Sequence, residues 1–183
     1  MKANDQNRIR TLIERLGRII ASDEWANDIN PTQWAALSYL AKANRFSRSP
    51  SQVAEFLAAT RGTTSQTLKA LARKELIREV RSEHDKRSIS YDVTNAGLAL
   101  LDGKNKQQDI ASLLNEQEAA SLLTGLETIT LRTLKQRGMR SFGICRECAH
   151  HQKSGRGGYC KLLDEQLSPD EVYQNCHEHA LEA

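Results

Sequence analysis

Two short segments in the middle of the chain alternate apolar and polar residues, and they restrict the possible folds most. Residues 77–83 (IREVRSE) and 88–94 (SISYDVT) flank the charged stretch HDKR. A period of two is typical of β-strands, so we expect a hairpin with a basic tip. Elsewhere up to residue 138, apolar residues recur at the three- to four-residue spacing of amphipathic helices. The pattern therefore predicts a mainly helical α+β fold that contains one hairpin.

Helix starts can be placed from capping residues. Asn30, Ser49 and Thr60 each precede a helical pattern and can accept a backbone hydrogen bond at its first turn. Thr94 can cap the helix after the hairpin, and Asn115 forms a capping box with the glutamate three residues later. We expect helices at about residues 7–22, 31–41, 50–57, 61–74, 95–114 and 116–137.

Positive charge gathers between residues 61 and 87. This stretch holds eight Lys or Arg residues and four acidic residues, an excess of +4, whereas the whole chain carries +3. A solvated helix surface could give the same count, so the count alone does not identify a binding surface. The helix at 61–74 also begins with small polar side chains, which suit base edges in the major groove, while cations suit phosphates. The predicted DNA-contacting residues are Arg61, Thr63, Thr64, Ser65, Gln66, Thr67, Lys69 and Arg73 in this helix, and Lys86 and Arg87 in the hairpin tip.

Short helices joined by a tight turn and followed by a hairpin describe a winged helix-turn-helix. The segment PTQWAALSYLAKANRFSRSPSQVAEFLAATRGTTSQTLKALARKELI, followed by DKRSISYDVTNAGLALL, resembles the MarR family of bacterial transcription regulators. The wing pattern, DKRS running into VTNAG, is the most specific part of this resemblance. The resemblance covers roughly residues 7–138 and stops before the cysteines.

This resemblance implies an obligate homodimer, with the winged part at about residues 32–97 and dimerisation helices at about 7–22 and 95–137. Each subunit would present one winged helix to half of a pseudo-palindromic operator in double-stranded DNA. A small-molecule effector could bind between the dimerisation and winged parts. The resemblance also implies that Arg61 to Lys74 form the recognition helix and that Asp85 orients Arg87.

One position departs from the family pattern. The family usually has glycine directly before the Leu-Ile that closes the recognition helix, and this chain has Glu75 there. Glycine at that place allows a left-handed C-cap. Unless the helix ends differently, glutamate in the left-handed conformation would cost ~1 kcal/mol.

All four cysteines lie near the C-terminus, with the spacing C-x2-C-x11-C-x15-C. The N-terminus lacks the apolar core of a signal peptide, and no apolar run could span a bilayer, so we expect a cytoplasmic protein without a membrane partner. In that reducing compartment, clustered cysteines favour a metal site over disulfides. The predicted ligands are Cys145, Cys148, Cys160 and Cys176, in a tail of residues 139–183 that follows a DNA-binding domain of residues 1–138.

The identity of the metal is less constrained than its ligands. A [4Fe-4S] cluster is favoured over zinc, because zinc tails usually supply two paired C-x2-C knuckles and this tail has one. Free thiols and a redox-active disulfide pair are the alternatives without metal. The histidines His150, His151, His177 and His179 could replace a ligand, but we expect them at the surface or beside the ligands.

The leading hypothesis is a transcription regulator, expected to be a repressor, that responds to the redox or iron state of its tail. The tail follows a helix expected in the dimer interface, so its state would change the spacing of the two recognition helices. A redox or electron-transfer protein, and a regulator or scaffold with a purely structural zinc tail, are the alternatives. No enzymatic activity is expected, because neither a nucleotide-binding G-x-G-x-x-G nor a nucleophile–base pattern is recognisable.

Overall fold

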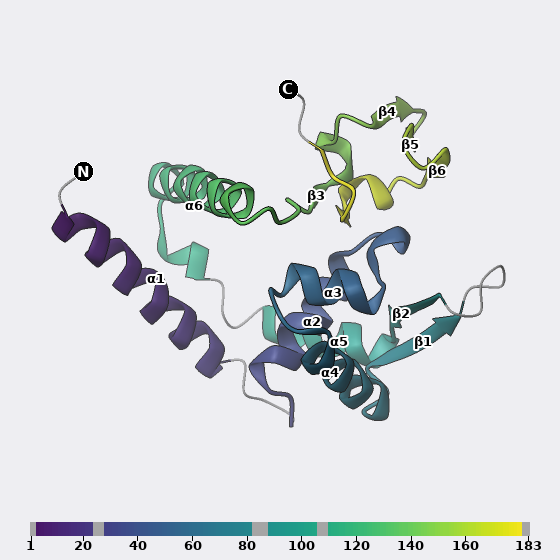
Figure 1. Cartoon of the computed structure of the whole chain (residues 1–183), viewed down its shortest axis with the longest axis horizontal. Helices are drawn as coiled ribbons and strands as arrows, with labels where there is room; N and C mark the ends of the chain where they lie inside the picture. The colour runs from purple at the N-terminus through teal and green to yellow at the C-terminus, as the bar shows by residue number, and fades with distance from the viewer. Residues whose placement is uncertain (1–2, 24–27, 82–87, 106–109, 181–183) are drawn as a thin grey trace.

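A computed structural model describes residues 3–23, 28–81, 88–105 and 110–180. Figure 1 shows three parts: a winged-helix body, two long helices to one side of it, and a small cysteine-rich tail above it. The body runs from α2 to α5, the long helices are α1 (Ala3–Asp23) and α6 (Glu116–Gln136), and the tail follows α6. None of the helices in the described ranges is long and apolar enough to cross a membrane.

The predicted caps begin the helices of the body. Helix α2 (Pro31–Lys42) starts after Asn30, and helix α3 (Pro50–Phe56) starts after Ser49, each with both bonds of a capping box. Helix α4 (Arg61–Arg73) starts after Thr60, whose side chain accepts the N–H of its third residue. Each cap satisfies backbone donors that the helix itself leaves free, so the starting points could be predicted locally.

The predicted hairpin is confirmed. Strands β1 (Ile77–Arg81) and β2 (Ile89–Val93) pair antiparallel, in the register that joins Ile77 to Val93 and Arg81 to Ile89. Residues 82–87 at its tip lie outside the described residues. The predictions for Asp85, Lys86 and Arg87 fall on that tip.

A single apolar core holds the body together. Leucines of α2 and α4 meet there with residues of α3, the hairpin and α5, and most of their side chains are fully buried. Burial of such side chains is the main stabilising contribution to a domain of this size. The core includes Ile29, Trp34, Leu37, Leu40, Val53, Leu68, Leu71, Ile77, Tyr91 and Leu101.

Helix α4 ends in a left-handed C-cap at the position where the family pattern has glycine. Glu75 has a φ of 57°. Its N–H bonds Ala72 O at 3.0 Å, and the N–H of Leu76 bonds Leu71 O at 3.1 Å. These two bonds form a Schellman motif, so the chain keeps the cap geometry although the residue in it is glutamate.

The helix expected at 95–114 is wrong in its second half. Helix α5 covers Asn95–Asn105, and residues 110–113 form a 3-10 turn, η2 (Ile110–Leu113), where the sequence predicts α-helix. Residues 106–109 lie outside the described residues. The capping box at Asn115 starts α6 as predicted.

The tail is built of short strands. Strands β4 (His151–Ser154), β5 (Gly157–Cys160) and β6 (Glu165–Leu167) form an antiparallel meander, and β3 (Gly143–Ile144) pairs with β7 (Asn175–Cys176). The 3-10 turn η3 (Cys145–Glu147) follows β3. After Ser168 the chain forms a 3-10 turn, η4 (Glu171–Tyr173). Ser168 and Glu171 do exchange capping hydrogen bonds, but the chain then extends into β7.

Candidate nucleic-acid interface and cysteine cluster

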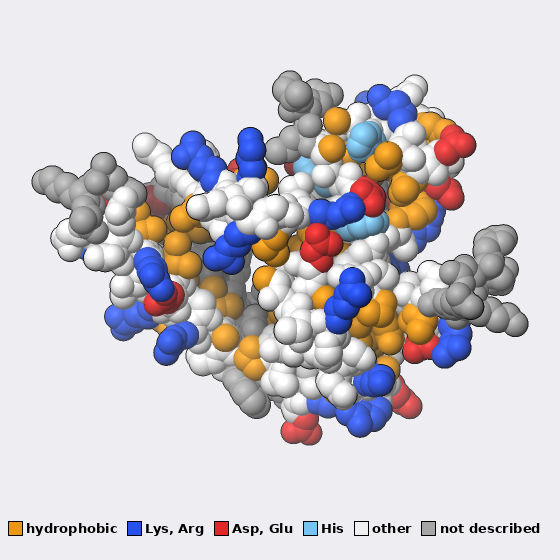
Figure 2. All heavy atoms as spheres, in the orientation of Figure 1, with side chains coloured by type: hydrophobic (Ala, Val, Ile, Leu, Met, Phe, Trp, Pro, Cys, Tyr) orange, Lys and Arg blue, Asp and Glu red, His pale blue; other side chains and the backbone are white. Residues whose placement is uncertain are grey.

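The outer face of α4 presents cations and polar side chains to solvent. The exposed residues on it are Arg61, Thr63, Gln66, Lys69 and Arg73, and Ser65 is half-buried beside them. Figure 2 shows Lys and Arg side chains gathered over the end of the molecule that α4 occupies in Figure 1. Free cations on one helix face can bind an anionic partner without first giving up an internal ion pair. Among the described carboxylates, none forms an ion pair with these three basic residues.

Two of the predicted contact residues do not belong to this face. The side chains of Thr64 and Thr67 are 1% and 8% exposed, so the prediction that they reach DNA is wrong. They share a helical stripe with Leu68 and Leu71, which pack in the core. The spacing of that stripe is the sequence signal that could have excluded them, because a contiguous polar run on a helix cannot all face one side.

A cleft lies beside the start of α4. It has a volume of about 610 Å³ and is lined by the starts of α3 and α4 together with the first residues of β2. Ser49, Ser51 and Ser65 supply hydroxyl groups, and Arg61 supplies the positive charge. These groups match the donors that proteins use for phosphate and sugar oxygens.

The base of the hairpin is fixed by an ion pair that the sequence analysis missed. Asp92 Oδ1 accepts from Arg48 Nη1 at 2.9 Å, and its Oδ2 accepts from Arg78 Nη2 at 3.0 Å. The N–H of Tyr91 also bonds Arg48 O at 3.1 Å. Arg48 stands between α2 and α3, so these bonds orient the hairpin relative to the helix-turn-helix. The two contacts of Arg48 join residues more than forty positions apart and have no local signature.

The long helices α1 and α6 leave their apolar stripes in solvent. Figure 2 shows hydrophobic side chains along the side of α1 that faces α6. An apolar groove of about 450 Å³ lies between the two helices and includes Ile9, Ile13 and Ile129. Exposed apolar stripes of this length are unfavourable in a monomer and indicate a protein interface. The stripe residues with more than a third of their surface exposed are Ile9, Leu12, Ile13, Leu16, Ile19, Ile20, Leu122, Leu123, Leu126, Ile129 and Leu131.

The short strands and turns of the tail carry all four cysteines. Cys145 follows β3, whose partner strand β7 carries Cys176, and Cys160 ends β5. Cys148 N–H bonds Cys145 O at 3.1 Å, which closes the C-x2-C turn. All four thiols are free, and three are buried while Cys148 is half-buried. Cys145 and Cys160 share a small buried cluster with Leu167 and Val172, so two thiols form half of its buried residues.

The environment of Cys145 disfavours its charged form. Burial and, after it, the neighbouring thiols of Cys176, Cys160 and Cys148 together raise the pKa of Cys145 to about 12. Charged thiolates would repel one another there unless a cation balanced them. The Ala180 N–H donates to Cys148 Sγ at 3.4 Å. Within the described residues, no three His, Cys, Asp or Glu side chains are yet arranged closely enough to hold a metal ion.

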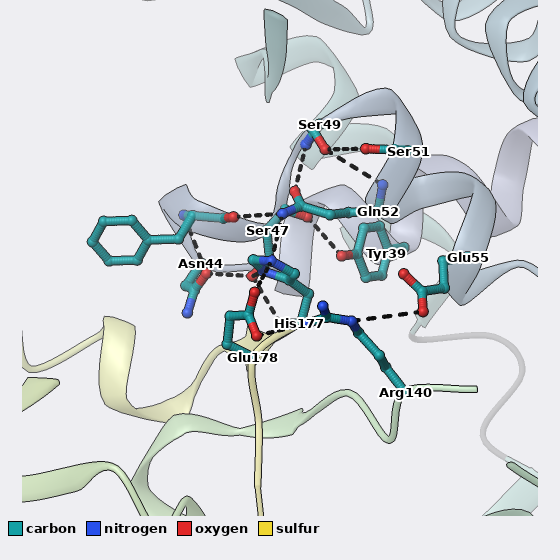
Figure 3. A network of polar contacts seen from close by, with 11 residues as sticks. Tyr39, Asn44, Ser47, Ser49, Ser51, Gln52, Glu55, Arg140, His177 and Glu178 are labelled. Carbon is teal, nitrogen blue, oxygen red and sulfur yellow. Dashed lines mark hydrogen bonds and ion pairs between the residues drawn. The ribbon is translucent and has the colours of Figure 1, made fainter. Parts of the chain in front are cut away.

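The tail docks on the body next to α3. Figure 3 shows His177 reaching from the tail to Ser47 and Gln52. The His177 N–H donates to Ser47 Oγ at 3.0 Å, and its ring nitrogens lie 3.2 Å from Ser47 Oγ and 2.9 Å from Gln52 Nε2. Burial lowers the pKa of His177, although Glu178 opposes the shift. The sequence predicts His177 at the surface or beside a ligand; it follows Cys176, and its contacts also join two parts of the fold.

Comparisons with known proteins agree with this architecture. A model of the MarR family matches residues 27–88. The S. aureus MepR–DNA complex has a TM-score of 0.56 at 24% identity, covering 70% of this chain and 97% of that chain. Streptococcus pneumoniae FabT in complex with DNA has a TM-score of 0.53 at 25% identity, with coverages of 72% and 98%. Wild-type MarR from E. coli in its apo form has a TM-score of 0.52 at 19% identity, with coverages of 70% and 96%. No curated protein matches the chain. Residues 27–88 therefore match the MarR family model, and the chain has a mainly helical, MarR-like winged-helix fold.

Proposed function

We propose that this protein is a sequence-specific, DNA-binding transcription regulator that acts as a homodimer on a pseudo-palindromic operator. The observation that carries the proposal is the exposed face of α4, where three cations that pair with none of the described carboxylates lie among small polar groups beside a hairpin. The solved structures of MepR and FabT with DNA have the same fold. Regulators of the matched family are non-enzymatic DNA-binding proteins, and this role requires no catalytic residues.

The second subunit would cover the apolar stripes of α1 and α6. A second copy is the natural partner because the two stripes lie side by side and bound a common groove. In a dimer with a two-fold axis, the same surface serves both subunits. The two recognition helices would then face half-sites about one turn of DNA apart, roughly 34–36 Å.

Individual residues would have distinct roles on DNA. Arg61, Lys69 and Arg73 would contact phosphates, and the cleft beside Arg61 would receive the backbone. Gln66 and its neighbour Ser65 would face base edges, where a glutamine can recognise adenine. Thr63 is exposed next to them, although its hydroxyl also lies 2.9 Å from the capping hydroxyl of Thr60. In the hairpin tip, Lys86 and Arg87 would reach the adjacent minor groove.

The test separates base contacts from phosphate contacts. A duplex selected from random sequence would be titrated with the whole protein by fluorescence anisotropy at several salt concentrations. We expect Gln66→Ala to change the preferred sequence at an unchanged salt slope, and Arg61→Ala to reduce the slope by about 1. Gln152→Ala, an exposed glutamine of β4, is the matched control. If the wild-type protein binds all duplexes alike, or if Gln66→Ala leaves the selected sequence unchanged, the proposal is wrong.

We also infer that Cys145, Cys148, Cys160 and Cys176 hold one metal centre. What supports this is the donor set: four free thiols gathered around a core with little apolar content. Four cysteines suit either a [4Fe-4S] cluster, favoured by the ligand spacing, or a tetrahedral zinc ion. A bound metal would replace the thiol protons and stabilise a segment that has few other cohesive contacts.

Anaerobic purification with metal and sulfide analysis tests this inference. One centre per chain is expected, and its absorption would distinguish a brown cluster from colourless zinc. Cys160→Ser should lower the metal content, while Gln152→Ala should retain it. Four titratable thiols and no metal in protein that binds DNA would contradict the metal site. Equal operator affinity with and without metal would show that the centre is structural and not regulatory.

A further inference from the structure

We infer that the cysteine-rich tail is an intrachain clamp on α3, with His177 as the positioning residue that holds α3 for DNA binding. The inference rests on the proposed function, because it concerns how the tail regulates the same DNA-reading surface. It differs from the route expected from the sequence, in which the tail acts through the dimer interface. The described polar contacts between the tail and the body converge on the segment from α2 to α3 (Figure 3).

His177 contacts three side chains through its ring. Its Nδ1 lies 3.2 Å from Ser47 Oγ, which donates in turn to Asn44 Oδ1 at 2.7 Å. Its Nε2 lies 2.9 Å from Gln52 Nε2 and 2.9 Å from Glu178 Oε1. The second hydrogen of the Gln52 amide bonds Phe46 O at 2.9 Å, and its Oε1 accepts the N–H of Ser49 at 2.8 Å. His177 therefore bonds the side chain that caps α3.

A second set of contacts holds the tail from the other side. Arg45 Nη1 donates to Glu171 Oε1 at 2.5 Å, and its Nη2 donates to Glu165 Oε2 at 3.2 Å and to Gln166 O at 3.0 Å. Arg45 belongs to η1 (Arg45–Ser47), the turn between α2 and α3. The tail thus binds this connection at two places that do not share a residue.

Aromatic side chains cross the boundary in both directions. Phe142 of the tail lies 5.4 Å from Phe56 at the end of α3 and 6.0 Å from Tyr39 of α2, measured between ring centroids. In return, Phe46 of the body packs against the core that contains the cysteines. Separation of the tail from the body would expose apolar surface on both.

The geometry favours support of DNA binding over obstruction. Figure 1 shows α3 between the tail and α4, so the tail lies on the side of α3 away from the recognition helix. Helix α3 is only seven residues long. A helix of that length is not stable alone and depends on its neighbours. Support from the tail would therefore fix the angle at which α3 holds α4.

The clamp is tied directly to a cysteine. His177 follows Cys176, and the preceding Asn175 pairs with Ala43 and accepts the N–H of Asn44 at 2.9 Å. Strand β7 is thus held by β3 on one edge and by the end of α2 on the other. Any change that unfolds the segment around Cys176 would remove His177 from Ser47 and Gln52. Each tail would act on the helix-turn-helix of its own subunit.

The experiment measures α3 and DNA binding separately, in the whole protein. We expect His177→Ala to raise the operator Kd about 5- to 10-fold, as loss of one or two hydrogen bonds to partly buried groups does. Amide hydrogen exchange in residues 50–56 should become faster, while the metal content and the selected sequence stay unchanged. His177→Asn keeps a nitrogen near Ser47 and should recover part of both losses. Gln152→Ala in β4 is the control.

Arg45→Ala is the second variant, and it tests whether the tail holds α3 if His177→Ala loses metal or fails to fold. Like His177→Ala, it should accelerate amide exchange in α3 and raise the operator Kd. Unchanged exchange and unchanged Kd in the folded variants would overturn the clamp. If the wild-type protein bound no duplex, the proposed function would fail, but the exchange measurement would still test whether the tail holds α3.

Discussion

At the end of α4, we expect a substitution by glycine to raise the free energy of unfolding. Substitution by glycine usually lowers it, because glycine has more conformational freedom in the unfolded chain. Glu75 is exposed and has a φ of 57°, in a Schellman motif closed by its own N–H and that of Leu76. Its carbonyl oxygen accepts from Thr94 Oγ1 at 2.7 Å, and that backbone bond survives any side-chain change. We therefore expect Glu75→Gly to stabilise the folded state.

The magnitude follows from two opposing contributions. A residue with a side chain pays about 1–2 kcal/mol in the left-handed conformation, which glycine does not. Glycine gains about 0.4–1 kcal/mol of conformational freedom in the unfolded chain, which opposes the effect. The difference is a stabilisation of about 0.5–1 kcal/mol, or a rise in Tm of roughly 1–4 °C for a chain of this length.

The reverse substitution can be made at the end of α6. Helix α6 ends in the same motif at Gly138, which has a φ of 63° and open space around the position of a Cβ atom. Its N–H bonds Lys135 O at 3.2 Å, and the N–H of Met139 bonds Leu134 O at 2.9 Å. Gly138→Glu should therefore destabilise by about the amount that Glu75→Gly stabilises, about 0.5–1 kcal/mol.

Urea denaturation at a fixed protein concentration measures both variants, because a dimer's stability depends on concentration. Glu75→Gln removes the charge and keeps the strained backbone, so it should stay within about 0.3 kcal/mol of the wild type if strain dominates. If Glu75→Gly destabilises the protein, or if Glu75→Gln stabilises it equally, the effect of the left-handed cap has been misjudged.

Two further predictions concern the hairpin. Arg87→Ala should weaken operator binding about 10-fold through loss of a charged contact in the minor groove; unchanged binding in a gel-shift titration at physiological salt would contradict the assignment of the wing. Asp92→Ala should release both Arg48 and Arg78 from the hairpin base and destabilise the body by about 1 kcal/mol. The pair with Arg78 should contribute little to this loss, because it is largely exposed. Denaturation of Asp92→Ala beside Arg78→Ala checks this, because the second variant should lose only a few tenths of a kcal/mol.

Local signals account for what the sequence could predict. The caps at Asn30, Ser49 and Thr60 involve neighbours within three residues, and the alternation in the hairpin has its partner strand a few residues away. The left-handed angle at Glu75 could also be anticipated, because the motif that imposes it is local. The polar run at the start of α4 predicts one solvent-facing surface, but the helix turns Thr64 into the core. A run of polar residues along a helix therefore does not by itself define one face.

Docking of the tail could not be predicted in this way. The bonds of Arg45 to the tail join residues more than 115 positions apart, and those of His177 join residues 125 and 130 apart. Single polar residues at such separations carry no pattern of spacing or alternation. The cysteines themselves could be recognised as a group because their residue type is rare and their chemistry is specific.

The exchange of aromatic side chains bears on how the protein unfolds. The core around the cysteines contains few apolar residues of its own, and Phe46 of the body completes it. The body in turn receives Phe142 from the tail against Tyr39 and Phe56. Neither part can separate without leaving an aromatic ring uncovered on the other, so the two parts stabilise each other. A tail joined to α6 by the chain but packed against α3 in space would therefore transmit its state to the recognition helix over a short path within one subunit, without a rearrangement of the dimer.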